Sequence, residues 1–98
     1  MSQPASNHPS KTTGHAGFPP TTTLSGSVNV NIEGKPAIMA GIVCAPHVNP
    51  SGTVHPTPTI STGSGSVNIN GQPATRIGDG LDCGDIIADG VTTVFIGG

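Results

Sequence analysis

Val-Asn-Ile-Glu-Gly-Lys-Pro-Ala occupies positions 30–37, and Val-Asn-Ile-Asn-Gly-Gln-Pro-Ala occupies positions 67–74. Val and Ile alternate with Asn in both stretches, which suits a strand that has one buried face and one wet face. The Gly-x-Pro-Ala that follows predicts a tight turn into a second short strand, because glycine frees the backbone and proline fixes φ. Each stretch therefore predicts a β-hairpin.

A shorter third copy, Val-Phe-Ile-Gly-Gly, occupies positions 94–98. A single short hairpin cannot bury its apolar face, so repeated hairpins are expected to stack on one another. Glycine and proline interrupt nearly every longer stretch, which disfavours helices. The sequence therefore predicts an all-β fold made of stacked β-hairpins.

The composition indicates that this fold needs support beyond a hydrophobic core. The chain has 98 residues, enough for one domain, and only 33% of them are hydrophobic, with two Phe and neither Trp nor Tyr. A chain this short buries only about 60% of its unfolded surface. Its net charge is −2, well below the strong charge typical of disordered chains. A bound metal is the first candidate for the missing stabilisation.

Charge and hydropathy exclude several classes of function. Three Lys and Arg residues cannot form a basic patch for nucleic acid, and no 18-residue apolar run predicts a membrane span. The N-terminus lacks the basic and apolar segments of a secretory signal, so we expect synthesis in the bacterial cytoplasm. Residues 1–13 are predicted to be a polar arm, and residues 14–98 the β domain.

Histidines and cysteines near the junctions between the hairpins form a candidate zinc site. Imidazole and thiolate ligands suit Zn²⁺, and a set that ties distant segments together removes the most entropy from the unfolded chain. On this reasoning the favoured ligands are His15, His47, His55 and Cys83. An alternative set replaces His47 with Cys44, which is otherwise interpreted as a small buried residue, because disulfides are rare in a reducing cytoplasm. His8, in the polar arm, is expected to take no part.

Several of these segments together resemble the PAAR-repeat proteins over roughly residues 14–98. The closest match to the family's Pro-Ala-Ala-Arg signature is Pro-Ala-Thr-Arg at positions 73–76, followed by Ile-Gly-Asp and then by Cys83-Gly84. The opening His-Ala-Gly-Phe-Pro-Pro at positions 15–20 is similar to that of phage-type members. The first copy departs from the pattern, because Pro-Ala-Ile-Met at positions 36–39 lacks the Arg and the following Asp.

The resemblance implies a small cone with pseudo-threefold repeats and one zinc ion near its apex. The family's three His and one Cys correspond to His15, His47, His55 and Cys83. It also implies a structural role without catalysis, as a monomer that caps a trimeric β-helical spike and sharpens it for membrane piercing. The expected place of action is the tip of a phage tail or of a type VI secretion spike, with any effector cargo on a separate protein.

Two other functions are weighed against this one. A zinc hydrolase would need a carboxylate base, and Asp79, Asp82, Asp85 and Asp89 lie near Cys83 in the sequence. We interpret these Asp residues as turn residues, and their spacing also lacks the pattern of an EF-hand calcium loop. A generic β-structural or adhesion module would share the repeats, and the metal content of the protein separates that alternative from the spike tip.

Overall fold

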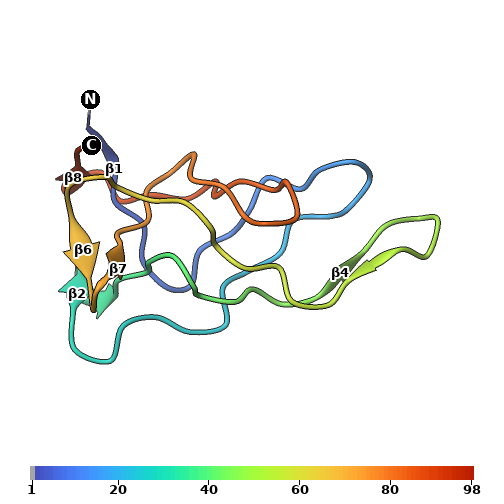
Figure 1. The fold of residues 1–98 in the computed structure, drawn as a ribbon, viewed down its shortest axis with the longest axis horizontal. Coiled ribbons are helices and arrows are strands. Elements are labelled where there is room, and N and C mark those ends of the chain that lie inside the picture. Colours follow the sequence, from blue (N-terminus) through green and yellow to red (C-terminus); the bar gives the residue numbers. More distant parts are fainter. Residues whose placement is uncertain (1) are drawn as a thin grey trace.

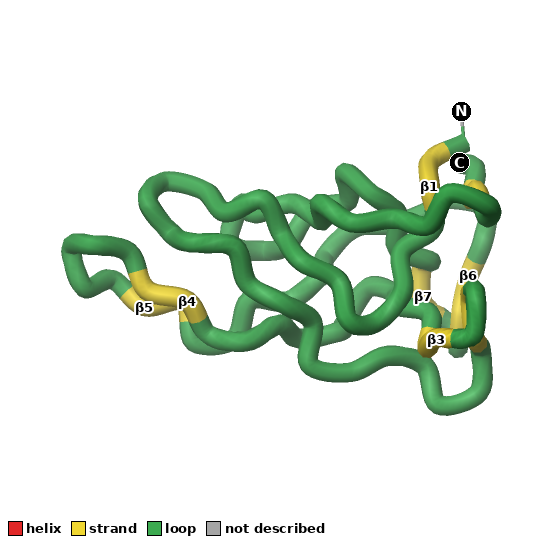
Figure 2. The backbone as a smooth tube through the Cα atoms, turned by 180° about the vertical axis from the view of Figure 1, so that it is seen from behind, coloured by secondary structure: helices red, strands yellow, loops and turns green. Residues whose placement is uncertain are grey.

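The computed structural model describes residues 2–98, which form short strands, turns and loops without a helix (Figure 1). Figure 2 shows that loops and turns make up most of the backbone. The strands are β1 (Gln3–Pro4), β2 (Asn31–Ile32), β3 (Lys35–Pro36), β4 (His47–Val48), β5 (Val54–His55), β6 (Asn68–Ile69), β7 (Gln72–Pro73) and β8 (Phe95–Ile96). They pair into four antiparallel two-stranded ladders, and the all-β prediction is confirmed. Within the described range, no segment has the helical length and hydropathy that crossing a membrane requires.

Both predicted hairpins are present, as the ladders β2–β3 and β6–β7. The two residues between the strands have positive φ in each hairpin: 52° and 78° at Glu33 and Gly34, and 52° and 80° at Asn70 and Gly71. Two consecutive positive φ angles define a tight turn whose twist matches that of the flanking strands. The positive φ at the second position of this turn favours glycine, which explains why Gly occurs there in both copies.

The third copy is completed by the opposite end of the chain. Strand β8 pairs with β1 in the register of the other two ladders, in which an isoleucine lies opposite the residue before a proline: Ile32 with Lys35, Ile69 with Gln72 and Ile96 with Gln3. Gln3-Pro4-Ala5 thus supplies the second strand that the third copy lacks in sequence order. Figure 1 shows the two ends of the chain side by side at this ladder.

This arrangement differs from the polar arm predicted for residues 1–13. Ala5, Ser6 and Ser10 have no exposed surface, and Thr12 is 2% exposed. Met1, the first residue of the predicted arm, lies outside the described residues. The polar composition of the segment concealed its role, because three of its polar residues, Ser6, Ser10 and Thr12, are buried rather than solvated. One example is the Ser6 hydroxyl, which donates to the carbonyl of Asp89 at 2.6 Å.

The three Pro-Ala segments bridge to one another in a closed ring. In each bridge, the alanine of one segment pairs with the residue two positions after the alanine of another segment. The pairs are Met39 with Ala74, Arg76 with Ala5, and Asn7 with Ala37. The carbonyl of each proline also accepts a backbone hydrogen bond from a neighbouring segment, in the same cyclic order. The amide of Ala40 donates to Pro73 at 2.9 Å, that of Ile77 to Pro4 at 3.0 Å, and that of His8 to Pro36 at 2.8 Å. Each segment is therefore paired on both sides, and the ring has pseudo-threefold symmetry.

Small residues at equivalent positions allow the three backbones to meet. The ring alanines Ala5, Ala37 and Ala74 are completely buried. A glycine precedes each strand pair, and a Cβ at these positions would lie 2.7 Å from Pro36 Cβ for Gly26, 2.6 Å from the Ala74 carbonyl oxygen for Gly63, and 2.8 Å from Pro4 Cβ for Gly90. The structural repeat therefore begins four residues before the valine that opens the sequence repeat.

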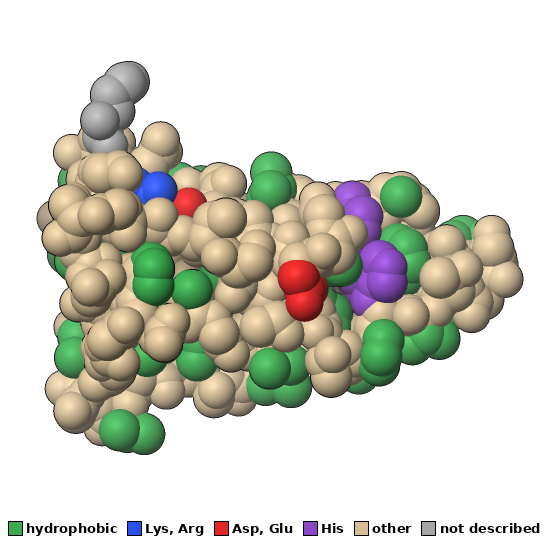
Figure 3. Space-filling view, in the orientation of Figure 1, with side chains coloured by type: hydrophobic (Ala, Val, Ile, Leu, Met, Phe, Trp, Pro, Cys, Tyr) green, Lys and Arg blue, Asp and Glu red, His purple; other side chains and the backbone are tan. Residues whose placement is uncertain are grey.

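Two small apolar clusters lie inside the molecule. The first gathers the inward residues of the three ladders and the ring: Ala5, Ile32, Ala37, Met39, Ile69, Ala74 and Ile96. The second comprises Ile38, Cys44, Ile60, Leu81 and Ile87, and Cys83 packs against it. The molecule measures 38 × 27 × 21 Å, broad at the three ladders and narrow at the end that carries β4 and β5 (Figures 1 and 3). This shape confirms the predicted cone.

Candidate metal centre

His47 and His55 face each other across the ladder of β4 and β5. They are register partners, so their side chains project from the same face of the ladder. The Nδ1 atom of His47 lies 3.0 Å from the carbonyl oxygen of Pro19, and its Nε2 atom lies 3.1 Å from Nδ1 of His55. A carbonyl oxygen can only accept a hydrogen bond, so Nδ1 of His47 carries the proton in this contact. In a neutral imidazole the other nitrogen, Nε2, then has a free lone pair that can bind a metal ion.

His15 reaches the same place from a tight reverse turn. His15 and Phe18 exchange both backbone hydrogen bonds, at 3.1 and 2.6 Å, and the residues between them, Ala16 and Gly17, have φ of 46° and 84°. The turn places the His15 ring 5.5 Å from the ring of His47 and 5.3 Å from that of His55, measured between centroids. Residues far apart in sequence thus bring three imidazoles together.

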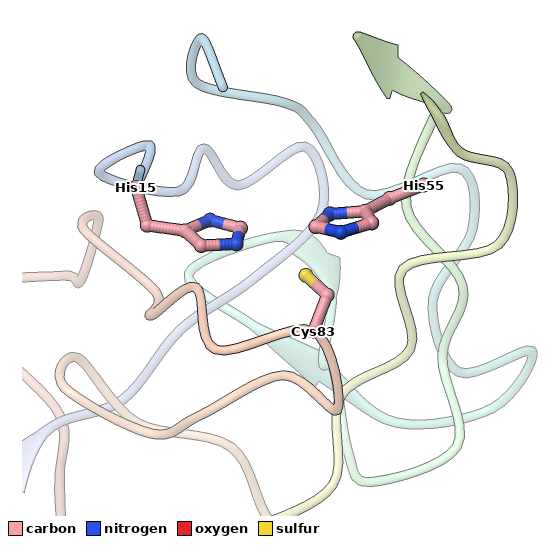
Figure 4. Close-up of side chains that lie close together, drawn as sticks. All are labelled: His15, His55 and Cys83. Atoms are coloured by element: carbon pink, nitrogen blue, oxygen red, sulfur yellow. The ribbon is translucent and has the colours of Figure 1, made fainter. Parts of the chain in front are cut away.

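Cys83 completes the group from a turn in which the Gly84 amide donates to the carbonyl of Leu81 at 3.1 Å. Its Sγ atom lies 3.9 Å from Nε2 of His47. His15, His55 and Cys83 each offer a ligand atom within 4.8 Å of the others, and Figure 4 shows the three side chains pointing toward one another. The structure therefore brings together all four residues of the predicted set, which can hold a metal ion.

The spacing of these atoms fits a tetrahedral ion. Zinc binds imidazole nitrogen at 2.0–2.1 Å and thiolate sulfur at about 2.3 Å, so two nitrogens of a tetrahedral site lie about 3.3 Å apart, and a nitrogen and a sulfur about 3.6 Å apart. The corresponding distances are 3.1 Å between His47 and His55 and 3.9 Å between His47 and Cys83.

Phe18 holds the imidazoles from one side. Its ring is 7% exposed, is stacked on His55 with centroids 3.8 Å apart, and lies 4.7 Å from His47 and 5.1 Å from His15. Nearly parallel rings exclude water from the His55 face and limit rotation of the imidazole. One of only two aromatic residues in the chain therefore supports the metal centre rather than the apolar clusters.

Asp85, which we interpreted from the sequence as a turn residue, also lies at the metal centre. It is 1% exposed, and its Oδ2 atom lies 3.9 Å from Nδ1 of His15. Asp85, His15 and His47 also offer three ligand atoms within 4.8 Å of one another. The Cys-Gly-Asp spacing could have suggested this, since Gly84 turns the chain at φ 100° and both of its neighbours face the same site.

Cys44 lies outside both groups of potential ligands. It is completely buried in the second apolar cluster, and it forms no disulfide with Cys83. Burial, with smaller contributions from Asp85 and Cys83, raises the pKa of the Cys44 thiol to about 11. Because Cys44 lies outside the groups of converging ligand atoms, the geometry favours His47 over Cys44 as the ligand.

The other acidic residues named as potential bases accept backbone hydrogen bonds, within one turn for Asp79 and between distant segments for Asp82 and Asp89. Asp79 accepts from the backbone amide of Arg76 at 2.7 Å and from its guanidinium at 3.1 Å. Asp82 accepts from the amide of Thr59, and Asp89 from that of Lys11. Asp82 also lines an open pocket that reaches the centre, together with His55, Pro56, Thr57, Pro58 and Cys83. Small solutes therefore have access to two of the predicted ligands.

Comparison with known families gave one match. Residues 13–89 match the family model described as PAAR motif, which covers most of the chain. The match spans the turn of His15, the ladder of His47 and His55, and the turn of Cys83. A comparison with curated proteins gave no match.

Proposed function

Because the chain belongs to the PAAR-motif family, we propose that it caps the blunt end of a trimeric β-helical spike in a contractile injection apparatus. The apparatus is a contractile phage tail or a type VI secretion system, and the cap sharpens the spike for membrane piercing. The family is structural rather than enzymatic, and we extend that character to this chain. In this role, the candidate metal centre makes the narrow end of the cone rigid, which a tip under mechanical load requires.

The pseudo-threefold base is the observation that carries this proposal. A monomer that docks on a trimer must present a similar surface to each of three identical subunits. The ladders β2–β3, β6–β7 and β1–β8 share one register and surround one ring, so a single chain offers three similar contact surfaces. These ladders occupy the broad end of the cone, away from the narrow end that carries β4 and β5 (Figures 1 and 3).

The outward face of the three ladders carries exposed amide and apolar side chains. Isoleucines face the core, so the preceding residues face outward at equivalent positions, as Asn31, Asn68 and Phe95. Phe95 is 56% exposed, and Val67 beside the second ladder is 38% exposed. Exposed aromatic side chains often dominate the affinity of an interface, while amides supply hydrogen bonds at low desolvation cost. This surface suits a protein partner better than solvent.

We further propose that the metal is zinc, held by His15, His47, His55 and Cys83. A soft thiolate with three imidazoles close by favours Zn²⁺ over the hard cations Ca²⁺ and Mg²⁺. Four protein ligands fill a tetrahedral shell and leave no position for a substrate or an activated water. The ion then cross-links three segments of the cone, which accords with a structural role and against a hydrolase.

Elemental mass spectrometry of protein purified without a histidine tag tests the metal. We expect about one zinc per chain, and loss of the dispersed amide NMR signals of the folded protein when a strong chelator enters through the open pocket. Protein that contains no metal and keeps its fold would contradict the zinc site and favour a metal-independent β-module.

Native mass spectrometry with the cognate trimeric spike tests the cap. We expect one chain per spike trimer, and we expect Phe95→Asn, which copies the outward residue of the other two ladders, to weaken the complex at least tenfold. Val48→Asn is the matched control, because Val48 is similarly exposed, at 47%, on the ladder at the opposite end. An equal loss from both variants, or no complex with the wild-type chain, would contradict docking through the base.

A further inference from the structure

Three side-chain atoms in the described part of the chain are buried and have no hydrogen-bond partner, namely His15 Nδ1, Thr75 Oγ1 and Asp85 Oδ2. Buried polar atoms are nearly always paired, so unpaired ones call for an explanation. Two of these three atoms face each other across 3.9 Å, in the metal centre itself. The His15 and Asp85 side chains are 20% and 0% exposed, so bulk water has little access to the gap.

Only one oxygen of Asp85 is free to serve the centre. Its Oδ1 atom accepts from the backbone amide of Ile86 at 2.8 Å and from the hydroxyl of Thr13 at 3.3 Å. These two bonds fix the plane of the carboxylate and leave Oδ2 directed at His15. An ionised carboxylate can only accept, so Oδ2 requires a donor or a metal ion.

We propose that Asp85 is a positioning residue, which accepts a hydrogen bond from Nδ1–H of His15 and so directs Nε2 of that ring toward the metal. This inference rests on the zinc site of the proposed function. A closure of about 1 Å brings the two atoms from 3.9 Å to hydrogen-bond distance. A histidine that binds a metal usually donates its other ring N–H to a carboxylate or a carbonyl oxygen.

His47 shows the same arrangement, with its Nδ1 atom already at hydrogen-bond distance from an oxygen. Nδ1 of His47 lies 3.0 Å from the Pro19 carbonyl oxygen, while its Nε2 faces His55 and Cys83. In His15 the edge that carries Nε2 faces the turn of Cys83, since a Cβ on Gly84 would lie 3.9 Å from that atom. Both rings therefore have an oxygen at Nδ1, and the short turn from Cys83 to Asp85 supplies one ligand and one supporting group.

Direct ligation by Asp85 is the competing role, because a carboxylate oxygen of Asp85 also lies within 4.8 Å of ligand atoms of His15 and His47. Two features favour the supporting role. Oδ2 lies beside Nδ1 of His15, the atom that is orphaned, and the three imidazoles with Cys83 already provide four ligands for a tetrahedral ion. The carboxylate then adds negative charge next to the site without entering it.

Competition with a chromophoric zinc chelator on Asp85→Asn and wild-type protein tests this role. The amide of Asn keeps one acceptor for Ile86 and Thr13 but presents NH₂ to His15, which favours the tautomer with a proton on Nε2. We expect zinc affinity to fall 10- to 100-fold. Asp79→Asn is the matched control, a buried acid that contacts Arg76 rather than the histidines, and its zinc affinity should stay within about twofold of wild type.

Two further readouts separate positioning from a merely structural role. In the Co²⁺-loaded Asp85→Asn protein, the tetrahedral d–d bands and the thiolate charge-transfer band should persist, because no ligand has been lost. In the zinc-loaded wild type, nitrogen-15 NMR should show a protonated Nδ1 on His15, a measurement that stands even if the variant fails to fold.

The outcomes that overturn the inference are distinct from those that overturn the zinc site. Equal zinc affinity in wild type and Asp85→Asn, an altered Co²⁺ coordination spectrum in that variant, or a protonated Nε2 on His15 would each refute positioning by Asp85 and leave the zinc site intact. Wild-type protein that binds neither zinc nor Co²⁺ would refute the site and this inference together.

Discussion

The base and the apex of the cone are held together in different ways. At the base, the same backbone hydrogen bonds occur three times: Ala37 N to Val30 O, Ala74 N to Val67 O and Ala5 N to Val94 O, each at 2.9 Å. At the apex, the contacts among His15, His47, His55 and Cys83 have no counterpart elsewhere in residues 2–98. Redundancy should make the base tolerant of single side-chain changes, whereas one lost ligand should disable the apex.

The largest effect is therefore expected from Cys83→Ser. Loss of the thiolate removes a ligand that a hydroxyl does not replace, and structural zinc contributes roughly 10–16 kcal/mol of apparent binding free energy in zinc-finger peptides. We expect loss of the metal and cooperative unfolding at ordinary temperature, followed by circular dichroism and elemental analysis. His15→Ala should behave in the same way.

Cys44→Ala is the control for this experiment, since it removes the other cysteine from a completely buried site. We expect a loss of about 1–2 kcal/mol from the smaller buried side chain, with one zinc per chain retained. If Cys44→Ala lost the metal and Cys83→Ser kept it, the ligand set would be wrong and Cys44 would be a ligand.

The base should break at its glycines rather than at its exposed side chains. In Gly63→Ala the new Cβ would lie 2.6 Å from the Ala74 carbonyl oxygen and 2.8 Å from that of Pro73, so the ring backbone must shift. We expect a loss of about 3 kcal/mol in chemical denaturation, with zinc stoichiometry unchanged. Gly90→Ala should cost a similar amount, because the third copy has the same geometry although it joins the two ends of the chain.

Gly71→Ala is the comparison variant for these substitutions. A Cβ on Gly71 meets nothing within 4 Å, so the cost comes only from its φ of 80° and should be about 1 kcal/mol. If the three substitutions had equal costs, the close approach of the backbones would not be what requires glycine at positions 63 and 90.

The sequence predicts local structure in this protein better than it predicts closure. The hairpins at positions 30–37 and 67–74 follow from turn chemistry within eight residues, and the grouping of His15, His47, His55 and Cys83 was anticipated. The pairing of β1 with β8 was missed, because no local pattern connects Gln3-Pro4 with Phe95-Ile96 across the whole chain. Asp85 was missed because an Asp in a turn has the same sequence context whether it bonds only the backbone or also faces a histidine.

Arg76 and Asp79 form a contact at the base that the first copy cannot make. The equivalent residues of that copy are Met39 and Ile42, whereas Arg76 binds Asp79 through two nitrogens and donates to the Gly97 carbonyl at 3.2 Å. The hydrogen bond to Asp79 raises the pKa of Arg76, so the guanidinium stays charged at every accessible pH. The pair thus ties the second copy to the third.

Arg76→Met, which gives copy two the residue of copy one, should have a smaller effect than the ligand substitutions and the ring-glycine substitutions. Asp79 is 8% exposed and would keep only the backbone amide of residue 76, so we expect a loss of about 2 kcal/mol by urea denaturation. The double variant Arg76→Met with Asp79→Ile should cost less than Arg76→Met alone, because it removes the buried carboxylate that the single change leaves without its partner. A double variant less stable than both single variants would mean that the pair is required by the ring, and that the three copies are not interchangeable.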